Sequence, residues 1–385
     1  MWCTLMLLTL AGTPSGQAVA GLEVYDDYFQ ALVGDDAKLA VQVAIGRHGR
    51  VIFSRGYGWA EPGVPLSPDS LFRIASISKP VTSAAIGQLV DAGRLSLDDK
   101  IVDRLGLTAK DERWHAITLR HLLQHRAGFD RDKSGDPMFM SRRIAADLGV
   151  PAPADGPAIV RWMLARPLDF APGERYAYSN FGYLLLGNVI EKVTGQSYEA
   201  YCQEHIWRAV GAARPRLGRS LLADRAPGEV LLDGAEPPRD SVFGEPGTKV
   251  PTPYGTFFFE PMAAHGGWLA SAADLVRFAQ AFDDPAHSPR LSAGTIAATF
   301  ARPDAGTEPT WYGLGWSVRD CGEGRLNTWH TGAIPGTSTL LVRRWDGLDW
   351  AVLFNRRSNA DHKDYASAVD GVMHELAAKV KAWPE

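Results

Sequence analysis

The sequence predicts an α+β fold in which strands from both ends of the chain build one antiparallel sheet around a mostly helical insertion. Short apolar runs around a glycine-bounded turn lie at residues 39–53, and two more strand-like runs lie near the carboxyl end. Residues 96 to about 260 are rich in helical segments and proline-containing loops. A length of 385 residues also exceeds one simple core. We therefore expect a sheet domain over residues 21–95 and 265–385, and a mostly helical domain over residues 96–264.

The amino-terminal elements follow from hydrophobic spacing. Residues 22–34 predict an amphipathic helix, because apolar side chains recur every three or four positions. These side chains are Leu22, Tyr25, Phe29 and Leu32. Residues 39–45 and 51–53 flank a turn that begins and ends with glycine, which predicts an antiparallel hairpin. A helical pattern then covers residues 76–92.

Helical patterns continue in the insertion, and a long loop follows them. Residues 118–125 and 181–193 have helical spacing, and Gly195 is expected to end the second helix as its C-cap. Residues 225–256 contain many prolines and glycines and little periodicity, so we expect a long surface loop there.

The carboxyl-terminal elements return to the sheet. Residues 271–282 predict a helix with Ser271 at its N-cap and an aspartate three residues later. Residues 337–342 and 350–354 have the apolar character of strands, and residues 365–380 close the chain as a helix.

Composition and charge are those of a globular protein that does not bind nucleic acid through its net charge. Apolar residues make up 45% of the chain and charged residues 22%, which is typical of a globular protein. The 40 basic and 44 acidic residues leave a net charge of −4. That charge gives no electrostatic reason to expect nucleic acid as a partner.

Residues 1–20 resemble a signal peptide. An apolar stretch, WCTLMLLTLAG, precedes Ala-Val-Ala, and cleavage is expected before Gly21. The stretch is too short for a stable membrane span. We therefore expect a periplasmic or secreted protein, although no Lys or Arg precedes the apolar run. The alternative is an amino-terminal helix packed on a cytoplasmic protein. Export would permit Cys202 and Cys321 to pair, and the sequence leaves this open.

Three short motifs carry the chemistry. The first is S-x-x-K at Ser76 and Lys79, which opens the predicted helix, so that the hydroxyl and the amine share one face. The helix dipole there favours developing negative charge. The second places Tyr178 two residues before Asn180, and a phenol beside a lysine can relay protons. Each of these also has a structural interpretation, as a capping serine with a surface lysine or as a turn with a packed tyrosine.

The third motif is His-Thr-Gly at residues 330–332, ahead of a predicted strand. A glycine in an extended segment marks a close approach of backbone or ligand. The alternative interpretation is a simple turn.

Together, the three motifs resemble those of the penicillin-recognising serine enzymes in order and spacing. The chain resembles D-Ala-D-Ala carboxypeptidases and class C β-lactamases, with esterases and D-aminopeptidases on the same scaffold. The resemblance covers roughly residues 22–380 and implies a β-lactamase/transpeptidase-like fold. Four further stretches carry it: ITLRHLLQHRAGF at 117–129, APG at 171–173, GGWL at 266–269 and YGLGW at 312–316.

The resemblance implies a role for each motif residue. Ser76 would form an acyl-enzyme, while Lys79 and Tyr178 move protons in an order that stays open. The backbone N–H groups of Ser76 and Ala333 would form the oxyanion hole. The implied substrate-binding residues are Asn180, His330, Thr331, Gly332, Ala333 and Arg319. The implied substrate is a small molecule or a peptide, with β-lactams as possible acylating ligands and no cofactor.

One departure from the family pattern concerns His330, which stands where β-lactamases of this shape have lysine. An imidazole is mostly neutral at pH 7 and anchors a carboxylate less firmly than an ammonium does. Arg319 could supply a cation instead, or lie solvated on the surface. We therefore expect a D-Ala-D-Ala carboxypeptidase-like enzyme or a carboxylesterase. The alternatives are a class C-type β-lactamase and a non-turnover β-lactam receptor.

Metal binding is not expected from the sequence. His121 and His125 lie four residues apart on a predicted helix, but the second position is Leu122 and no third ligand is evident. The chain also has no G-x-S-x-G nucleophile elbow.

Overall fold

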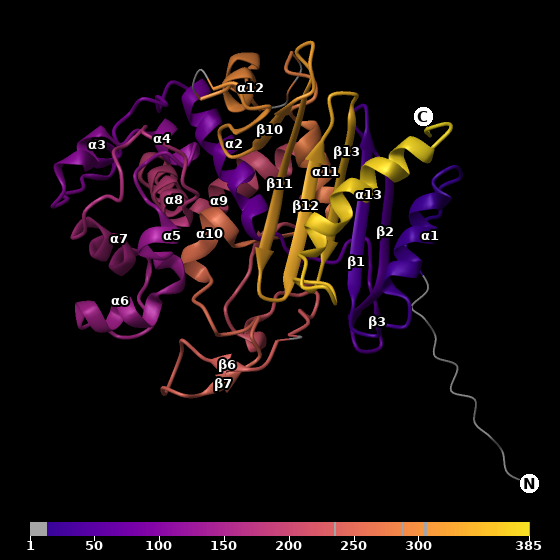
Figure 1. Cartoon of the computed structure of the whole chain (residues 1–385), viewed down its shortest axis with the longest axis horizontal. Coiled ribbons are helices and arrows are strands. Elements are labelled where there is room, and N and C mark those ends of the chain that lie inside the picture. Colours follow the sequence, from indigo (N-terminus) through magenta and orange to yellow (C-terminus); the bar gives the residue numbers. More distant parts are fainter. Residues whose placement is uncertain (1–13, 235, 287, 289, 304–305, 385) are drawn as a thin grey trace, which may run out of the picture.

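The protein is described by a computed structural model that covers residues 14–384, except residues 235, 287, 289, 304 and 305. Its centre is an antiparallel sheet of eight strands in the order β3, β2, β1, β13, β12, β11, β10, β9 (Figure 1). In that order the strands are Val64–Pro65, Arg50–Glu61, Ala40–Arg47, Leu348–Phe354, Thr337–Arg343, Leu326–Ile334, Ser317–Asp320 and Thr310–Tyr312. The predicted α+β architecture is therefore confirmed.

The two ends of the chain meet at the pairing of β1 with β13. The register places Val41 opposite Phe354 and Val43 opposite Val352. Val41 and Val43 belong to one apolar cluster, whereas Ala40 and Ala44, on the opposite face of the strand, belong to another. Because both faces of these strands are covered, the sequence shows continuous apolar runs here rather than alternation.

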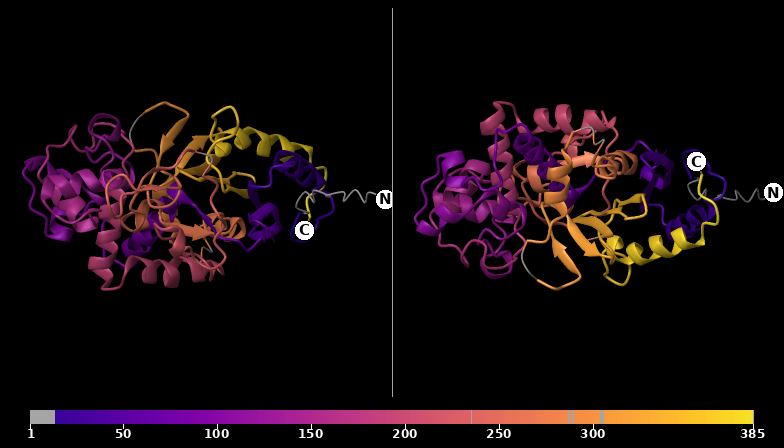
Figure 2. Two further views of the ribbon diagram at one scale, coloured as in Figure 1. Left: turned by 90° about the horizontal axis from the view of Figure 1, so that it is seen from below. Right: turned by 90° about the horizontal axis from the view of Figure 1, so that it is seen from above.

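Helices cover both faces of the sheet. Helices α1 (Glu23–Val33) and α13 (Tyr365–Lys379) pack side by side on the outer face, as Figure 2 shows from two sides. Helix α11 (Ala272–Gln280) packs on the inner face, and α2 (Ser78–Asp91) lies beside it toward the helical insertion. The inner apolar cluster continues from these helices into the insertion. The boundaries of two separate domains accordingly stay a prediction.

The insertion is mostly helical, as expected. Its helices are α3 (Ile101–Leu105), α4 (Leu119–Leu123), α5 (Arg131–Ser134), α6 (Ser141–Leu148), α7 (Gly156–Leu164), α8 (Asn180–Thr194) and α9 (Tyr198–Cys202), and α10 (Ala263–Gly266) and α12 (Ala293–Phe300) follow. Gly195 ends α8 in the left-handed conformation, as predicted. Ser271 and Asp274 form a reciprocal capping box at the start of α11.

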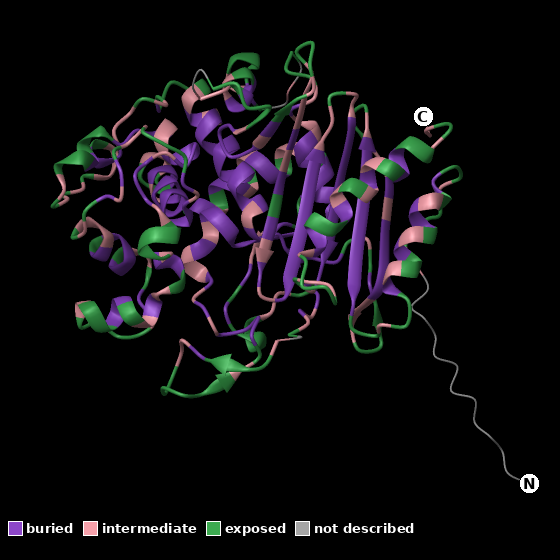
Figure 3. Cartoon of the chain, viewed as in Figure 1, coloured by how far each residue is buried: buried purple, intermediate pink, exposed green. Residues whose placement is uncertain are grey.

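Two elements differ from the sequence prediction. Strand β2 extends to Glu61, well beyond the predicted residues 51–53. The prediction was too short because the rest of the strand carries glycines and a buried Arg55 beside Asp26 instead of an apolar run. The predicted loop over residues 225–256 contains a short hairpin of β6 (Arg239–Asp240) and β7 (Lys249–Val250). Figure 3 shows this hairpin exposed below the buried strands.

The amino-terminal prediction lies partly outside the described residues. Residues 1–13 are not described, and Ser15 forms a backbone bridge with Gly56. Export and cleavage before Gly21 therefore stay predictions. No helix in residues 14–384, as far as they are described, is long and apolar enough to cross a membrane. Cys202 is buried, Cys321 is half-buried, and both thiols are free, so the two do not pair in this structure.

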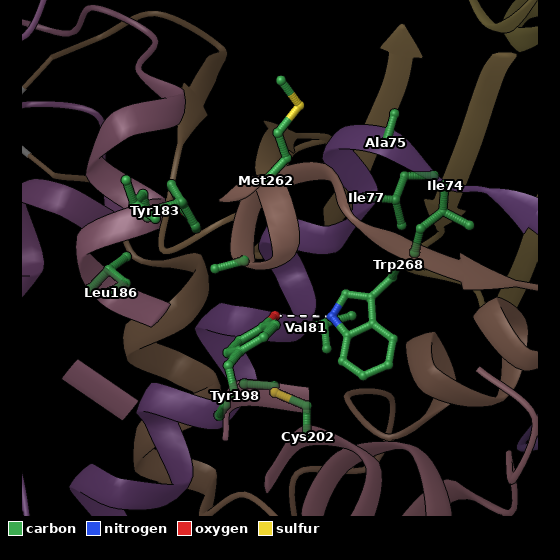
Figure 4. Packing of buried hydrophobic residues seen from close by; sticks show 14 of the residues in the cluster. Ile74, Ala75, Ile77, Val81, Tyr183, Leu186, Tyr198, Cys202, Met262 and Trp268 are labelled. Carbon is green, nitrogen blue, oxygen red and sulfur yellow. Dashed lines mark hydrogen bonds between the residues drawn. The ribbon is translucent and has the colours of Figure 1, made fainter. Parts of the chain in front are cut away.

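A packed Trp268 holds the start of α2 in place. Strand β8 (Trp268–Ala270) pairs with β4 (Phe72–Arg73) on one side and with β5 (Arg216–Leu217) on the other. The indole of Trp268 donates to the Tyr198 hydroxyl at 3.0 Å, drawn as a dashed line in Figure 4. The Trp268 backbone also donates to Ser78 Oγ and accepts from Ile74 N.

A buried ion pair ties the long loop to the strand before α2. The Arg73 guanidinium donates to Glu229 at 3.0 Å, and both side chains are fully buried. Its remaining nitrogens donate to the backbone carbonyls of Pro253 and Arg219. Each guanidinium nitrogen thus has an acceptor, and Glu229 is the counter-charge, so loss of Glu229 leaves an uncompensated buried charge.

We expect Glu229→Gln to lower the free energy of unfolding by about 3 kcal/mol, because the Arg73 charge then lies buried without a counter-charge. Urea titration followed by tryptophan fluorescence measures this change. Asp69→Asn is the matched control, because Asp69 pairs with Arg214 at 3.5 Å on the surface. That control should cost less than about 1 kcal/mol. Equal losses in the two variants would contradict the importance of the buried pair.

Candidate active site

Ser76 lies at a tight turn between β4 and α2. Ala75 has a positive φ of 46°, a conformation that is uncommon for a residue with a side chain. Residues Ala75–Ile77 form one 3₁₀ turn, and α2 begins at Ser78, two residues after the predicted helix start. This turn presents a half-exposed Ser76 at the start of the helix, where the positive end of the dipole lies.

Strands β11 and β12 clamp this turn from the other side. The hydroxyls of Thr337 and Thr339 donate to the carbonyls of Arg73 and Ile74, at 2.9 and 3.0 Å. Gly332 of β11 lies against the same turn, and a Cβ atom there would come within 2.2 Å of the Ile74 carbonyl oxygen. Only glycine fits at this position. The close approach expected from the His-Thr-Gly motif is thus present.

The Ser76 hydroxyl contacts both of its expected partners. Lys79 Nζ lies 3.1 Å from Ser76 Oγ, and the Tyr178 hydroxyl donates to the same oxygen at 2.8 Å. Ser76 comes from the 3₁₀ turn ahead of α2, Lys79 from the first turn of α2, and Tyr178 from the residue pair ahead of α8. They therefore form one hydrogen-bonded unit, which the S-x-x-K and Y-x-N motifs predicted.

Lys79 is fully buried and its amine has two fixed acceptors. Nζ donates to Asn180 Oδ1 at 2.8 Å and to the His265 carbonyl at 3.0 Å. Burial holds the pKa of the Lys79 amine well below its usual value, and the neighbouring Asp136 charge opposes this shift. In a neutral amine the two acceptors engage both hydrogens. The lone pair then faces the Ser76 hydroxyl, ready to accept its proton.

Tyr178 stays protonated in this arrangement. Burial raises the pKa of its hydroxyl far above the usual value, so the phenol donates to Ser76 instead of accepting from it. The Arg131 guanidinium lies 4.5 Å above the Tyr178 ring and brings a positive charge to the mouth of the site.

The two histidines that resemble a metal pair have other roles. The Nδ1 atom of His125 accepts from the Ser179 backbone N–H at 3.1 Å, and its ring lies 4.3 Å from that of Tyr178. His121 closes a capping box with Thr118 at the start of α4. Both imidazoles therefore hold backbone segments in place.

His330 lies in the site as a neutral, fully engaged imidazole. Its Nδ1 is 2.6 Å from the Thr331 carbonyl, which can only accept, so Nδ1 carries the proton. Nε2 then accepts from the Tyr312 hydroxyl at 2.9 Å. Burial is the main reason that the pKa of His330 falls to about 3, with the Lys79 charge as a second cause. The imidazole supplies no positive charge near pH 7.

The remaining predicted residues divide into two groups. Asn180 and Gly332 lie in the site, and the half-buried Ala333 follows Gly332 on β11, so its role in an oxyanion hole stays a prediction. The side chain of Thr331 is exposed. Arg319 is not brought to the site. It is exposed, and its guanidinium lies 5.3 Å from the ring of Trp329, which packs against the outer apolar cluster.

A cleft of about 400 Å³ is lined in part by Tyr312, whose hydroxyl bonds His330. Its aromatic walls are Tyr176, Trp311, Tyr312 and Trp329. Arg126 and Arg302 also line it, and the Arg302 guanidinium stacks 4.0 Å from the Trp311 ring. The cleft therefore offers flat aromatic surfaces around Tyr312.

Sequence reasoning missed Asp136 and Arg131. Asp136 accepts from Asn180 Nδ2 at 2.6 Å, and Arg131 lies over Tyr178. Arg131 begins α5 and Asp136 caps the 3₁₀ turn that follows it, in a segment where the sequence has no motif that singles them out. Tyr312 could have been found, because it begins the YGLGW stretch that carried part of the resemblance.

Comparison with known proteins identifies one family for this chain. The family model described as Beta-lactamase matches residues 25–372. The chain is 33% identical over 252 residues to a probable fimbrial assembly protein, FimD of Dichelobacter nodosus, with 64% of this chain and 58% of that protein covered. It is 27% identical to esterase EstB of Burkholderia gladioli, with 76% of each chain covered.

A solved structure agrees with the fold. The octameric penicillin-binding protein homologue from Pyrococcus abyssi has a TM-score of 0.70 and 22% identity, with 95% of this chain and 80% of that chain covered. The family match extends over nearly all the described residues and includes Ser76, Lys79 and Tyr178. The chain therefore belongs to the Beta-lactamase family.

Proposed function

We propose that the protein is a serine hydrolase that forms an acyl-enzyme at Ser76 and acts as a carboxylesterase on small neutral esters. One observation carries the proposal of hydrolysis. The Ser76 hydroxyl lies within hydrogen-bond distance of a buried Lys79 amine and of the Tyr178 phenol. Membership of the Beta-lactamase family supports the same class of reaction, on an ester or an amide.

The proton path of the proposed reaction follows from the donors in the site. Neutral Lys79 accepts the Ser76 proton while Ser76 Oγ forms a bond to the substrate carbonyl carbon. The bond to the leaving oxygen then breaks, and Tyr178 donates its proton to that oxygen and recovers one from Lys79. Water next attacks the acyl-enzyme, loses its proton to the same pair, and releases the acid and the free Ser76 hydroxyl.

The choice of neutral esters rests on His330. A substrate carboxylate gains most from a charged partner, since charge-assisted hydrogen bonds are roughly twice as strong as neutral ones. The imidazole is neutral, and both of its nitrogens already have partners. The aromatic cleft beside Tyr312 suits an apolar leaving group. The D-Ala-D-Ala peptides and β-lactams of the alternative functions carry a carboxylate, for which this imidazole offers no charged partner.

We expect one covalent adduct, at Ser76, when the protein is treated with a fluorophosphonate. Intact-mass spectrometry and peptide mapping measure the stoichiometry and the site. Ser78→Ala is the control, because this serine lies two residues away and bonds the Trp268 backbone. It should be labelled as the wild type is, whereas Ser76→Ala should not. Equal labelling of Ser76→Ala would contradict the nucleophile assignment.

Lys79 and Tyr178 should act as one unit. We expect Lys79→Ala and Tyr178→Phe each to lower kcat/KM for a 4-nitrophenyl ester by roughly 10²–10⁴-fold. The double variant should be little worse than the poorer single variant, because groups that share one proton path lose activity non-additively. Steady-state kinetics on the four proteins test this. Additive barrier increases would indicate two independent roles.

The His330 interpretation predicts a pH-independent preference. We expect the ratio of kcat/KM for 3-carboxyphenyl acetate to that for 3-(methoxycarbonyl)phenyl acetate to stay constant between about pH 5.5 and 8.5. The imidazole, with its pKa lowered to about 3, is neutral throughout this range, so no charge is lost as the pH rises. Titration of Lys79 changes kcat/KM for both substrates alike, so its effect cancels in the ratio. A ratio that falls through the ordinary imidazole range would show a charged His330 and favour carboxylate substrates.

A further inference from the structure

Asp136 is the only carboxylate among the described residues that contacts an immediate hydrogen-bond partner of Lys79. Its Oδ2 accepts from Asn180 Nδ2 at 2.6 Å, and the same amide accepts from Lys79 through Oδ1 at 2.8 Å. Oδ1 of Asp136 accepts from the Met138 backbone N–H, which fixes the carboxylate at the start of the 3₁₀ turn Pro137–Phe139. A chain of three side chains thus runs from Asp136 through Asn180 to the base.

We propose that Asp136 is a positioning residue that sets the orientation of the Asn180 amide and, by its charge, the protonation of Lys79. This goes beyond the proposed function and does not depend on which substrate is hydrolysed.

The orientation role follows from the donors and acceptors. An amide presents an acceptor at one end and donors at the other, and an ionised carboxylate can only accept. Asp136 therefore holds the Nδ2 end of Asn180, which turns Oδ1 toward Lys79. If the amide were reversed, its NH₂ group would face the lysine amine and the buried amine would lose an acceptor. Such an unsatisfied buried group costs about 1–3 kcal/mol.

The charge role follows from the surroundings of Lys79. The groups that face the amine from neighbouring elements are Ser76, His125, Arg131, Asp136, Tyr178, Asn180, Tyr183, His265 and His330. Arg131 disfavours the ammonium, and the buried histidines add no counter-charge. Asp136 alone in this set favours the charged lysine. Its negative charge therefore limits how far burial lowers the pKa of Lys79.

Arg131 completes the arrangement around Asp136. Burial raises the pKa of the Asp136 carboxyl, while the Asn180 and Met138 hydrogen bonds and the Arg131 and Lys79 charges favour its ionised form. The exposed Asp132 follows Arg131 in α5, lies 3.9 Å from the Arg131 Nε and has no place in the chain of bonds to Lys79. The segment thus offers a matched carboxylate for comparison.

The experiment measures the second-order rate of Ser76 phosphonylation by a fluorophosphonate against pH. In this reaction the Ser76 oxygen bonds to phosphorus, fluoride leaves, and the serine proton passes to Lys79. The rate falls at low pH as Lys79 becomes protonated. We expect Asp136→Asn, which keeps the shape and an acceptor oxygen, to move this acidic limb to lower pH by about one unit. Asp132→Asn should leave the limb in place.

The orientation role has a separate readout. Asp136→Ala should lower the plateau rate about ten-fold, whereas Asp136→Asn should retain most of it. In an Asn180→Ala background, Asp136→Ala should have little further effect on the plateau, because the amide that it orients is gone. Circular dichroism and thermal unfolding confirm that each variant is folded.

Three results would overturn the proposal. The limb of Asp136→Asn could coincide with that of the wild type, or Asp132→Asn could shift it as far. Asp136→Ala could also lower the rate equally with and without Asn180, which would indicate a role in folding alone. Because phosphonylation needs only an activated Ser76, failure to hydrolyse any ester would count against the proposed esterase and leave this test intact.

Discussion

Burial of the Lys79 amine is the constraint on which the rest of the site depends. An ammonium taken out of water loses its hydration, and the protein here returns only carbonyl and hydroxyl oxygens in its place. That exchange is what leaves the amine able to accept a proton. Burial also keeps the groups around the amine neutral. It is the main reason that the pKa values of His125, His265 and His330 are lowered.

The buried Lys79 amine lies beside the half-exposed Ser76, and segments from distant parts of the chain hold the two in this position. The nucleophile turn is fixed by β8 on one side and by the β11–β12 pair on the other, and Gly332 allows the two backbones to touch. Each of the three hydrogen bonds joins a side-chain hydroxyl, of Ser78, Thr337 or Thr339, to a backbone group. The position of the nucleophile therefore depends on small side chains outside the three motifs as well as on the motifs themselves.

Local patterns in the sequence were sufficient for the elements and for part of the site. The i, i+3 spacing placed Ser76 with Lys79, the cap residues placed helix ends at Gly195 and Ser271, and apolar runs located strands from both ends of the chain. The length of β2 was underestimated, because its glycines and buried Arg55 do not follow an apolar pattern. Asp136 and Arg131 were invisible, because their roles exist only once a loop folds against residues more than forty positions away. Arg319 lies exposed beside the Trp329 ring, the surface position that the sequence left open, because proximity in sequence to the Gly-Leu-Gly-Trp stretch does not determine where a side chain lies.

The pairing of β1 with β13 has a consequence for how the protein is made. Strand β1 is synthesised early, but its partner ends at Phe354, more than three hundred residues later. Thr337 and Thr339, which fix the nucleophile turn, also belong to this late segment. The amino-terminal half cannot complete its sheet until β13 has been synthesised, and contacts of such long sequence separation form slowly. The nascent chain thus carries Ser76 and Lys79 without a formed active site until β12 and β13 leave the ribosome.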